Sequence, residues 1–512
     1  MTAAQRWVIG LASVGSFMVV LDLLVVATAL TSIHRGLHAS IEELEWTVNA
    51  YTLSFAALLM TSASLGDRFG RRRLLATGLA VFALGSVACA LATSAGALIA
   101  ARAVQGIGAA AIMPVSLALL NSAFPAQQRG RALGIYGSVT GLAAVLGPVL
   151  GGVITQGLAW QWIFWLNVPV ALAAIPLVLT RLQESFGPGA RLDLLGLGLF
   201  TLATTGLVWG LVRADSARWG SAGVIGPLAA GVAGVLAFLG WQARAAAPML
   251  PLRLFRSRAF SAGNASIFLL NGSMTGAVFF MTQYQQVSLG QGPLGAGLRL
   301  LPWGIAPFLI APRTGALADR LGERPLVVTG LAAQAAGMAW IALIASPRLS
   351  YALLVAPMTL AGIGFALAIP AVTKAVVSTS AAADIGKASG AYSTMRQLGG
   401  AFGVAILAAV FGAAGSYTSA AAFSRGFGPA IGVAAALALA GAVAGIALPA
   451  RRLRPGPPAP ASASPAPASA SPAPASVSPA PASVSPAPAS PAPASPASTS
   501  PAPASADSVQ AS

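Results

Sequence analysis

Residues 65–78 read LGDRFGRRRLLATG, and residues 317–330 read LADRLGERPLVVTG. Leu, Asp, Arg, Gly, Arg, Thr and Gly recur at the same positions of both stretches. Each stretch is a short basic loop that joins two long apolar segments. Helical membrane proteins are often built from two related halves. The match therefore predicts an internal repeat, with one copy of this loop in each half of the chain.

The composition is typical of a chain that lies in lipid. Hydrophobic residues make up 56% of the chain and charged residues only 8%, whereas soluble proteins carry about 25% charged residues. Segments long enough to cross the ~30 Å hydrocarbon core of a bilayer recur along the sequence. We place them at 8–33, 46–65, 74–93, 96–120, 131–156, 160–180, 192–212, 221–242, 260–286, 294–317, 325–346, 350–375, 388–413 and 427–449. Since helices of this length satisfy every backbone polar group in lipid, the sequence predicts an all-α polytopic membrane protein with fourteen transmembrane helices.

Lys and Arg are distributed unequally between the two sides of the predicted membrane. Of the 29, 21 fall in loops on the side of the N-terminus, five on the other side and three within or near spans. Positively charged residues are kept on the cytoplasmic side. This bias and the even number of spans place both termini in the cytoplasm of a multi-pass protein of the cell membrane. The three residues within or near spans are Arg102, Arg299 and Arg396.

The position of the repeated loop predicts how the chain is divided. A plain doubling of six helices would put the second loop after span 8, but it follows span 10, so two extra helices are expected near 192–242. The predicted parts are a six-helix half at 1–182, the two inserted helices and a loop at 183–258, a second six-helix half at 259–454 and a tail at 455–512. The tail is almost wholly Pro, Ala and Ser, which predicts a disordered cytoplasmic segment.

The residues present argue against several classes of function. The net charge of +17 comes from short loops rather than from one basic face, so no nucleic acid is expected as a partner. Cys89 is the one cysteine, and His34 and His38 share a polar loop, where a solvated pair is preferred over a metal site. The Gly-Lys pair at 386–387 lacks the following Ser or Thr of a phosphate-binding loop, which argues against an ATP-driven pump. No cluster of His, Cys and carboxylates suits an enzyme, and no cofactor is expected.

Asp22 is the one acid that the sequence places deep in the membrane, because the others fall in predicted loops, span ends or the tail, including Glu42, Glu43 and Glu45 in the first loop. A carboxylate in a span costs roughly 2.5–3.5 kcal/mol. Arg102, near the start of the fourth span, is its expected partner because a guanidinium stays charged. Burial and a nearby cation act on the proton affinity of a carboxylate in opposite directions, so a change of surroundings can load and release a proton. We interpret Asp22 as a proton carrier, with a static ion pair as the alternative.

Span 5 ends in GLAAVLGPVLGG, residues 141–152. Small residues four positions apart allow two helices to touch backbone to backbone, and a proline removes a hydrogen bond and bends the axis. The residues concerned are Gly141, Gly147, Pro148, Gly151 and Gly152. This pattern predicts a tight seam, which could seal one face between the two halves.

These motifs resemble those of the major facilitator superfamily and, within it, of the fourteen-helix drug:proton antiporter family. The resemblance covers roughly residues 5–450 and is carried by GDRFGRRR at 66–73, RAVQGIGAA at 102–110, GLAAVLGPVLGG at 141–152, WQWIFWLNVP at 160–169 and GKASGAYSTMRQLGGAFG at 386–403. LDLLVVATAL at 21–30 matches in part, because this chain has Leu24 and Ala27 where relatives usually carry a small polar residue and an Asn.

The resemblance implies a fold of two six-helix halves plus two extra helices, and export of lipophilic drugs or antibiotics in exchange for protons by alternating access. It implies that Asp22 and Arg102 couple transport to protons, and that the glycine motif of span 5 separates antiporters from importers. By the same analogy, a conformational latch would comprise Gly66, Asp67, Arg71, Asp319, Arg320 and Arg396.

The substrate cavity is expected to be lined by aromatic, thioether and amide side chains of the central helices. These are Met18, Tyr51, Phe55, Met113, Asn271, Met274, Phe279, Gln283 and Tyr284. An apolar pocket with few polar groups suits lipophilic molecules. With one deep acid serving the proton, neutral or monocationic compounds fit better than dications. The expected partners are such a compound, protons and the lipid bilayer, and the chain is expected to function as a monomer.

Two alternatives to drug export remain open at this point. One is a solute:proton symporter of the same fold, which would import its substrate. The other is a membrane sensor or scaffold that does not transport and has no need of Asp22.

Overall fold

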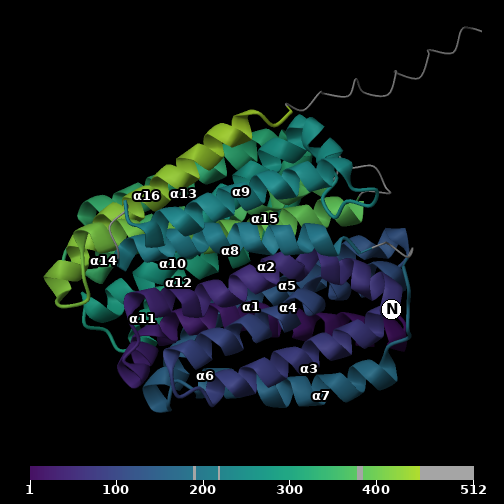
Figure 1. The fold of residues 1–512 in the computed structure, drawn as a ribbon, viewed down its shortest axis with the longest axis horizontal. Coiled ribbons are helices and arrows are strands. Elements are labelled where there is room, and N and C mark those ends of the chain that lie inside the picture. Colours follow the sequence, from purple (N-terminus) through teal and green to yellow (C-terminus); the bar gives the residue numbers. More distant parts are fainter. Residues whose placement is uncertain (188–191, 217–219, 378–384, 450–512) are drawn as a thin grey trace, which may run out of the picture. The chain divides into compact units, whose positions relative to one another are not determined.

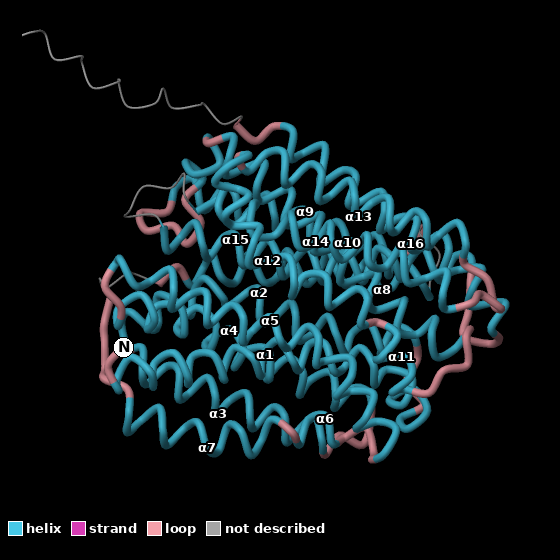
Figure 2. Tube along the Cα trace, turned by 180° about the vertical axis from the view of Figure 1, so that it is seen from behind, coloured by secondary structure: helices cyan, strands magenta, loops and turns pink. Residues whose placement is uncertain are grey.

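The computed structural model describes residues 1–187, 192–216, 220–377 and 385–449, apart from some side chains, chiefly within 126–145 and 307–320. This part of the chain consists of helices joined by short loops and contains no strand (Figure 1, Figure 2). The helices in chain order are α1 (Ala3–Leu37), α2 (Ile41–Phe69), α3 (Arg71–Ala90), α4 (Ala95–Ala123), α5 (Ala126–Gly157), α6 (Trp162–Trp165), α7 (Asn167–Arg181), α8 (Leu194–Ser216), α9 (Ala222–Arg244), the short 3₁₀ helix η1 (Leu252–Arg256), α10 (Arg258–Val287), α11 (Pro293–Arg299), α12 (Leu301–Leu321), α13 (Glu323–Ile344), α14 (Tyr351–Val377), α15 (Ile385–Ala414) and α16 (Ala420–Ile446). They belong to one compact unit, Met1–Arg452, and the tail at 455–512 lies outside the described residues.

Capping residues begin the first two helices. Thr2 accepts a hydrogen bond from the backbone N–H of Gln5, and the side chain of Gln5 accepts one from the N–H of Thr2 at 3.0 Å. Ser40 and Glu43 form the same capping box at the start of α2. Each box satisfies two backbone donors that the first helical turn leaves free. The box at Ser40 begins α2 several residues before its apolar stretch.

The helices of the two predicted halves pack in the same order. In the first half, α1 contacts α4 and α5, α2 contacts α4, and α3 contacts α4 and α7. In the second half, α10 contacts α14 and α15, α12 contacts α14, and α13 contacts α14 and α16. The repeated loops also turn alike, at Gly70 and Gly322, whose φ angles of 102° and 88° favour glycine. The internal repeat in the sequence is thus matched by a repeated pattern of packing.

The pair α8 and α9 has no counterpart in this repeated pattern. The two helices pack on each other, and α8 also contacts α2 and α15, which meet across the boundary between the halves. The rings of Trp46 on α2 and Trp209 on α8 lie 5.2 Å apart. These are the two extra helices expected near 192–242, and they lie beside the contact between the halves.

Each predicted span falls on helical residues, although two of the spans are divided between two helices. Among the described residues, 11 helices are long and apolar enough to cross a membrane, with α6 and α7 counted together, and the bent helix α2 would make up to 12. The helices α5 and α12, with 32 and 21 residues, coincide with two further predicted spans. Two spans are wrongly predicted to be continuous: the helix at 160–180 is interrupted at Leu166, between α6 and α7, and that at 294–317 is interrupted at Leu300, between α11 and α12.

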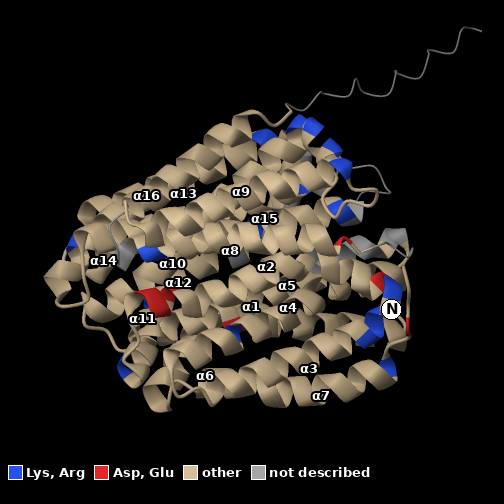
Figure 3. Ribbon diagram, in the orientation of Figure 1, with Lys and Arg blue, Asp and Glu red and all other residues tan. Residues whose placement is uncertain are grey.

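Charged residues are placed mostly near the helix ends, and most Lys and Arg positions lie at the end of the bundle that holds the N-terminus (Figure 3). We call this the basic end, and its described residues include Arg71, Arg72, Arg73, Arg181 and Arg244. The other end is called the opposite end. Between the two ends the helices are largely apolar, so the few polar side chains buried there define the candidate site.

Candidate functional site

Asp22 and Arg102 meet in the interior of the first half. Asp22 lies midway along α1 and is 2% exposed, and Arg102 lies on α4 and is fully buried. Nη1 of Arg102 forms an ion pair with Oδ2 of Asp22. The partner expected for Asp22 is therefore in contact with it. Neither side chain reaches solvent in this conformation, so each compensates a charge that the interior could not otherwise hold.

Two amides complete the surroundings of the Asp22 carboxylate. Nε2 of Gln105, one turn after Arg102, donates to Asp22 Oδ1 at 2.8 Å, and Nδ2 of Asn167 on α7 donates to the same oxygen at 3.0 Å. Both amides also donate to Oγ of Ser86 on α3, at 2.8 and 3.4 Å. A hydrogen bond to a charged group contributes about 1.5–3 kcal/mol. The carboxylate is therefore held by α4 and α7, and α3 orients the two amides.

The Arg102 guanidinium is fixed on several sides. Nε donates to the carbonyl oxygen of Thr47 on α2 at 3.1 Å, and Nη1 donates to Gln105 Oε1 at 2.6 Å. Cζ lies 4.2 Å from the ring centroid of Tyr51 and 5.8 Å from that of Phe164. Such cation–π contacts add about 0.5–2 kcal/mol each. Nη2 is buried and has no hydrogen-bond partner among the described residues.

Gln105, Asn167 and Ser86 are functional-site residues that the sequence reasoning did not identify. Two of them have a feature in the sequence from which a place in the site could have been inferred. Gln105 follows Arg102 by one helical turn, and Asn167 lies in the motif WQWIFWLNVP. Because buried polar side chains are nearly always hydrogen-bonded, polar residues on the inner faces of these spans could have been assigned to the Asp22 cluster. Ser86 has no comparable signal in its surroundings.

The position expected for Glu45 is wrong. Glu45 was placed in the loop after the first span, but it lies in α2 and is fully buried. The reason is the capping box at Ser40, which begins the helix earlier than its hydropathy indicates. Asn49, one turn further along, is also buried, and its amide has no hydrogen-bond partner among the described residues. Asp22 is therefore not the only buried acid.

The glycines of α5 contact the backbone of α1 within the same half. A Cβ atom added to Gly147 would lie 2.6 Å from Cβ of Leu24, and one added to Gly151 would lie 2.9 Å from the carbonyl oxygen of Val25. Leu24 packs into the α1–α5 seam, where it makes an apolar contact between the two helices.

The same helix α5 reaches the other half at the opposite end. A Cβ atom on Gly152 would lie 2.6 Å from Cα of Leu294, at the start of α11, and Gly297 packs on the carbonyl group of Pro148. Oε1 of Gln156 accepts a hydrogen bond from the backbone N–H of Leu294 at 3.2 Å. The two halves therefore touch backbone to backbone here. Gly141 also lies in α5, but its surroundings are outside the described part of the chain.

A second contact joins the halves near the opposite end. Gln286 on α10 accepts a hydrogen bond from the Thr31 hydroxyl on α1 and donates one to the carbonyl oxygen of Thr28 at 3.0 Å. Together with the contact of α5 and α11, this bond holds the halves in contact at that end.

Most residues predicted to line the substrate cavity are packed in this conformation. Met18, Tyr51, Phe55, Phe279, Gln283 and Tyr284 are buried, whereas Met113, Asn271 and Met274 are half-buried. Gln283 accepts a hydrogen bond from Tyr417, and Tyr284 stacks on Phe427 with ring centroids 4.1 Å apart. Of the three half-buried residues, Asn271 forms a bond between α10 and α15, where its Nδ2 donates to the carbonyl oxygen of Arg396 at 2.7 Å.

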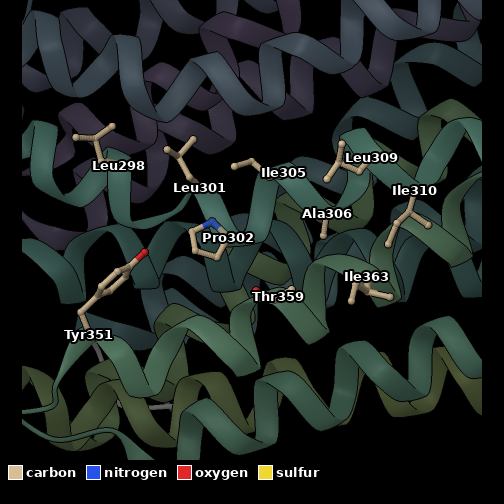
Figure 4. Close-up of a pocket in the computed structure, with 10 residues that line it drawn as sticks. All are labelled: Leu298, Leu301, Pro302, Ile305, Ala306, Leu309, Ile310, Tyr351, Thr359 and Ile363. Atoms are coloured by element: carbon tan, nitrogen blue, oxygen red, sulfur yellow. The ribbon is translucent and has the colours of Figure 1, made fainter.

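A groove of about 480 Å³ lies between α11–α12 and α14 (Figure 4). Its lining residues are Leu298, Leu301, Pro302, Ile305, Ala306, Leu309, Ile310, Tyr351, Thr359 and Ile363. Leu298 and Leu309 are 44% and 55% exposed, so the groove opens on the outer surface of the bundle. No residue of the Asp22 cluster lines it, and its lining is apolar apart from Tyr351 and Thr359.

The residues predicted to form a latch fall into three groups. Asp67 accepts hydrogen bonds from Arg71 Nε at 3.0 Å and Nη2 at 2.7 Å, and a Cβ on Gly66 would lie 3.1 Å from Val115 Cγ2. The side chains of Asp319 and Arg320 are outside the described residues. Arg396 forms no hydrogen bond or ion pair with Asp67, Arg71 or any other described side chain.

Glu184, in the loop after α7, lies next to the α2–α3 loop and was not among the residues predicted to form the latch. Glu184 accepts a hydrogen bond from the backbone N–H of Arg72 at 2.8 Å, and its carboxylate lies 3.6 and 3.7 Å from Arg72 and Arg73. The Asp67 carbonyl oxygen accepts a bond from the N–H of Gly187 at 3.1 Å. The α2–α3 loop is therefore tied to the end of α7 within the first half.

A helical membrane protein with two repeated halves, a buried ion pair in one of them and a close contact between them has the architecture of a two-half transporter. The sequence profile of the Major Facilitator Superfamily matches residues 12–404 and 265–488. The chain belongs to the major facilitator superfamily, and it is a multi-pass membrane transporter rather than an enzyme.

Curated relatives and solved structures agree with this assignment. The chain is 35% identical over 401 residues to the multidrug resistance protein Stp of Mycobacterium tuberculosis (strain CDC 1551 / Oshkosh), covering 78% of this chain and 74% of Stp. It is 36% identical over 458 residues to the cephamycin export protein CmcT of Amycolatopsis lactamdurans, covering 88% and 93%. A crystal structure of a POT family transporter in complex with 5-aminolevulinic acid superimposes with a TM-score of 0.64 at 13% identity, covering 85% of this chain and 94% of that one. The structural likeness concerns the fold alone.

Proposed function

We propose that the protein is a proton-driven efflux transporter, a drug:proton antiporter that exports lipophilic drugs or antibiotics by alternating access. The observation that carries the proposal is the ion pair of Asp22 and Arg102, buried between α1 and α4. Ionisable residues inside membrane spans are costly and are usually kept for function. The direction of transport is suggested by relatives whose names refer to drug resistance and export.

In this proposal Asp22 is the proton carrier and Arg102 its fixed counter-charge. A proton that reaches Asp22 removes the negative charge and frees Arg102, which still donates to Thr47 and Gln105. Release of the proton restores the pair and its packing between the helices. The proton gradient supplies the energy, and no cofactor takes part. Because Arg102 compensates Asp22, we expect compounds with at most one charge rather than dications.

The proposed arrangement in the membrane follows the distribution of Lys and Arg. Fourteen spans are formed by the candidate helices together with α5 and α12, both termini lie in the cytoplasm, and the opposite end faces outward. The seam of Gly152 and Leu294 then closes the outward side, which corresponds to an inward-facing or occluded state. We expect the α2–α3 loop, with Asp67 and Arg71, to act as a latch on the cytoplasmic side, and the monomer to be the working unit.

The direct test compares wild type with Asp22→Asn in everted membrane vesicles. In acidified vesicles, addition of a transported lipophilic drug should release protons from the wild type, and Asp22→Asn should release none. Cells that produce Asp22→Asn should be as drug-sensitive as cells without the protein, although the variant is present in the membrane at the wild-type level. The isosteric amide keeps the hydrogen bonds to Gln105 and Asn167 possible while it removes the titrating group.

Glu45→Gln is the matched control, because it also replaces a fully buried acid by its amide. We expect this variant to keep substrate-induced proton release. Proton uptake instead of release on addition of substrate would identify an importer. Unchanged efflux by Asp22→Asn would show that Asp22 is not the proton carrier. It would favour a different proton carrier or a protein that does not itself transport.

A further inference from the structure

We propose that the guanidinium of Arg396 binds a single negative charge on the transported compound, so that the protein exports lipophilic monoanions, above all carboxylates. The proposal rests on the transport function proposed above, and it replaces the neutral or monocationic substrate expected from the sequence by a monoanion.

Arg396 is a charged residue within a membrane span, and its side chain has no hydrogen-bond or ion-pair partner in the part of the chain that the structure describes. It lies 11 positions after Ile385, the first residue of α15, which corresponds to about 16 Å along the helix at 1.5 Å per residue. The residue is half-buried, and its Nε is fully buried without a hydrogen-bond partner. No hydrogen bond or ion pair joins its guanidinium to any residue in the described part of the chain. An arginine in a span that has no counter-ion usually marks the path of a substrate or ion.

Two tyrosines from different halves lie within electrostatic range of this guanidinium, and Tyr392 precedes Arg396 by one turn of α15. Tyr136 on α5 and Tyr392 on α15 are each close enough for an electrostatic interaction with Arg396, and each is 7% exposed. Their hydroxyl groups are already engaged. Tyr136 donates to Oγ of Ser16 on α1 at 2.7 Å, and Tyr392 accepts from Thr373 on α14 at 2.7 Å. The rings are therefore held in place, and neither hydroxyl supplies a negative charge.

The backbone of Arg396 is fixed by a hydrogen bond from α10. Nδ2 of Asn271, on α10, donates to its carbonyl oxygen at 2.7 Å. Arg396 thus lies on α15 beside α10, and its electrostatic interaction with Tyr136 reaches α5 of the other half. A group bound there would touch both halves, as a substrate of a two-half transporter must do. Half-buried Asn271 adds an amide next to it.

Five carboxylates among the described residues pair with other basic side chains and are not available to Arg396. Asp22 pairs with Arg102, Asp67 with Arg71, Glu184 with Arg72 and Arg73, Glu42 with Arg213, and Glu323 with Lys374. The guanidinium presents planar donors that match a carboxylate in a two-point contact. The tyrosine rings next to it suit an apolar body. One lipophilic molecule with one carboxylate fulfils both requirements.

The experiment uses three dyes that share one lipophilic body and differ in a single group: a carboxylate, its methyl ester and an amine. The full chain is reconstituted in phosphatidylcholine vesicles, so that no anionic lipid headgroup competes for Arg396. We expect wild type to transport the carboxylate best. Arg396→Gln should raise the KM for the carboxylate by about tenfold or more, the value of one charged hydrogen bond, and should change that for the ester less than about twofold. Arg396→Lys should recover part of the carboxylate transport, because it restores the charge.

Arg299→Gln is the control, because Arg299 is another arginine near a span, with Cζ 4.9 Å from the ring centroid of Tyr351. It should leave all three KM values unchanged. An equal loss of transport of all three dyes in Arg396→Gln would mean that Arg396 has a structural role. No loss of transport would mean that its side chain only reaches the lipid interface. Either result overturns the proposal, and so does a wild type that prefers the amine.

A binding measurement separates this proposal from the proposed function. The carboxylate dye should raise the unfolding temperature of the purified wild type and not that of Arg396→Gln. Binding without transport of any dye would support the Arg396 site and overturn the antiporter. Proton-coupled transport of the ester without binding of the carboxylate would overturn the Arg396 site and leave the antiporter standing.

Discussion

The two halves share one scaffold but differ in what they bury at its centre. Helix α4 packs on α1, α2 and α3, and α14 packs on α10, α12 and α13 in the matching way. On α4 the interior holds Arg102 and Gln105, which meet Asp22. The second half buries a neutral polar contact instead: Nε2 of Gln334 on α13 donates to Oγ of Ser273 at 3.0 Å and to the carbonyl oxygen of Leu270 at 3.3 Å.

This difference shows that the fold does not require a buried ion pair. The second half reaches the same packing with an amide and a hydroxyl. Replacing a buried ion pair by neutral groups is often harmless to stability, whereas removing one partner is not. The pair of Asp22 and Arg102 is therefore better explained by function than by folding, and the first half is the one expected to carry the proton.

The largest expected effect comes from breaking the pair on one side. Arg102→Gln leaves Asp22 buried without its cation, which should cost about 3–5 kcal/mol of stability. Gln334→Leu, the control in the second half, removes neutral hydrogen bonds and should cost only about 1 kcal/mol. The unfolding temperature of each purified variant in detergent measures the difference.

A double variant tests the cause of this loss. Asp22→Asn combined with Arg102→Gln removes both charges and should recover most of the stability lost in Arg102→Gln, although not the transport. Equal losses of stability in Arg102→Gln and Gln334→Leu would contradict the conclusion that the two halves differ in the polar contacts they bury.

The second prediction concerns glycines at which two helices touch backbone to backbone. The contact of α5 joins the two halves, and that of α15 lies within the second half. Gly152→Ala places a Cβ 2.6 Å from Cα of Leu294 in the other half, and a backbone cannot easily move. We expect a cost of about 1–3 kcal/mol and a contact between the halves that no longer closes. Vesicles with this variant should leak protons in the absence of substrate.

Two glycine variants serve as controls for the seam. Gly157→Ala lies on the same helix with nothing within 4 Å of the added Cβ, and it should be neutral or slightly stabilising. Gly403→Ala disturbs the packing of α15 on Gly272 of α10, within one half. It should lower stability without a proton leak. A leak in Gly403→Ala as large as in Gly152→Ala would show that the seam between halves has no special role.

Much of the fold could be predicted because lipid imposes strong local rules. Apolar runs of about 20 residues must be helical, and each predicted span falls on helical residues. The exceptions have local causes as well. The capping box at Ser40 extends α2 beyond its apolar part and places Glu45 in the buried part of the helix, and the break at Leu300 comes two residues before Pro302, which stands in the first turn of α12.

The candidate site was predictable only in part, because its contacts join distant residues. Asp22 and Arg102 stand out as charges within spans, which is a property of single positions. Asn167 is 145 residues from Asp22, and nothing in the sequence alone fixes the rotation of α7 that brings them together. For the same reason Gln283 and Tyr284 were predicted to face the cavity, whereas in this conformation they pack against Tyr417 and Phe427.

The smallest expected effect concerns the inserted pair α8 and α9, which neither half repeats. Asp193, one residue before α8, accepts hydrogen bonds from Trp241 Nε1 and Gln242 Nε2, both at 2.7 Å, and from the N–H groups of Gly196 at 2.8 Å and Met249 at 3.3 Å. Burial opposes the ionisation of Asp193, but these hydrogen bonds outweigh it and hold its pKa below the ordinary value. The stabilisation is therefore present above the unfolded pKa of about 3.9 and is lost as the pH falls through the lower folded pKa.

The measurement is the fluorescence of Trp241, taken as the difference between wild type and Trp241→Phe, while the pH is lowered from about 7 to about 3. We expect a transition below about pH 4 in the wild type and none in Asp193→Asn, whose amide cannot titrate. Transport at neutral pH should be almost the same in wild type and in Asp193→Asn, because the hydrogen bonds of Asp193 lie outside the two halves. A midpoint above about pH 4 would mean that burial outweighs the hydrogen bonds. Loss of transport in Asp193→Asn at neutral pH would mean that the inserted pair takes part in the movement of the halves and is more than an addition beside them.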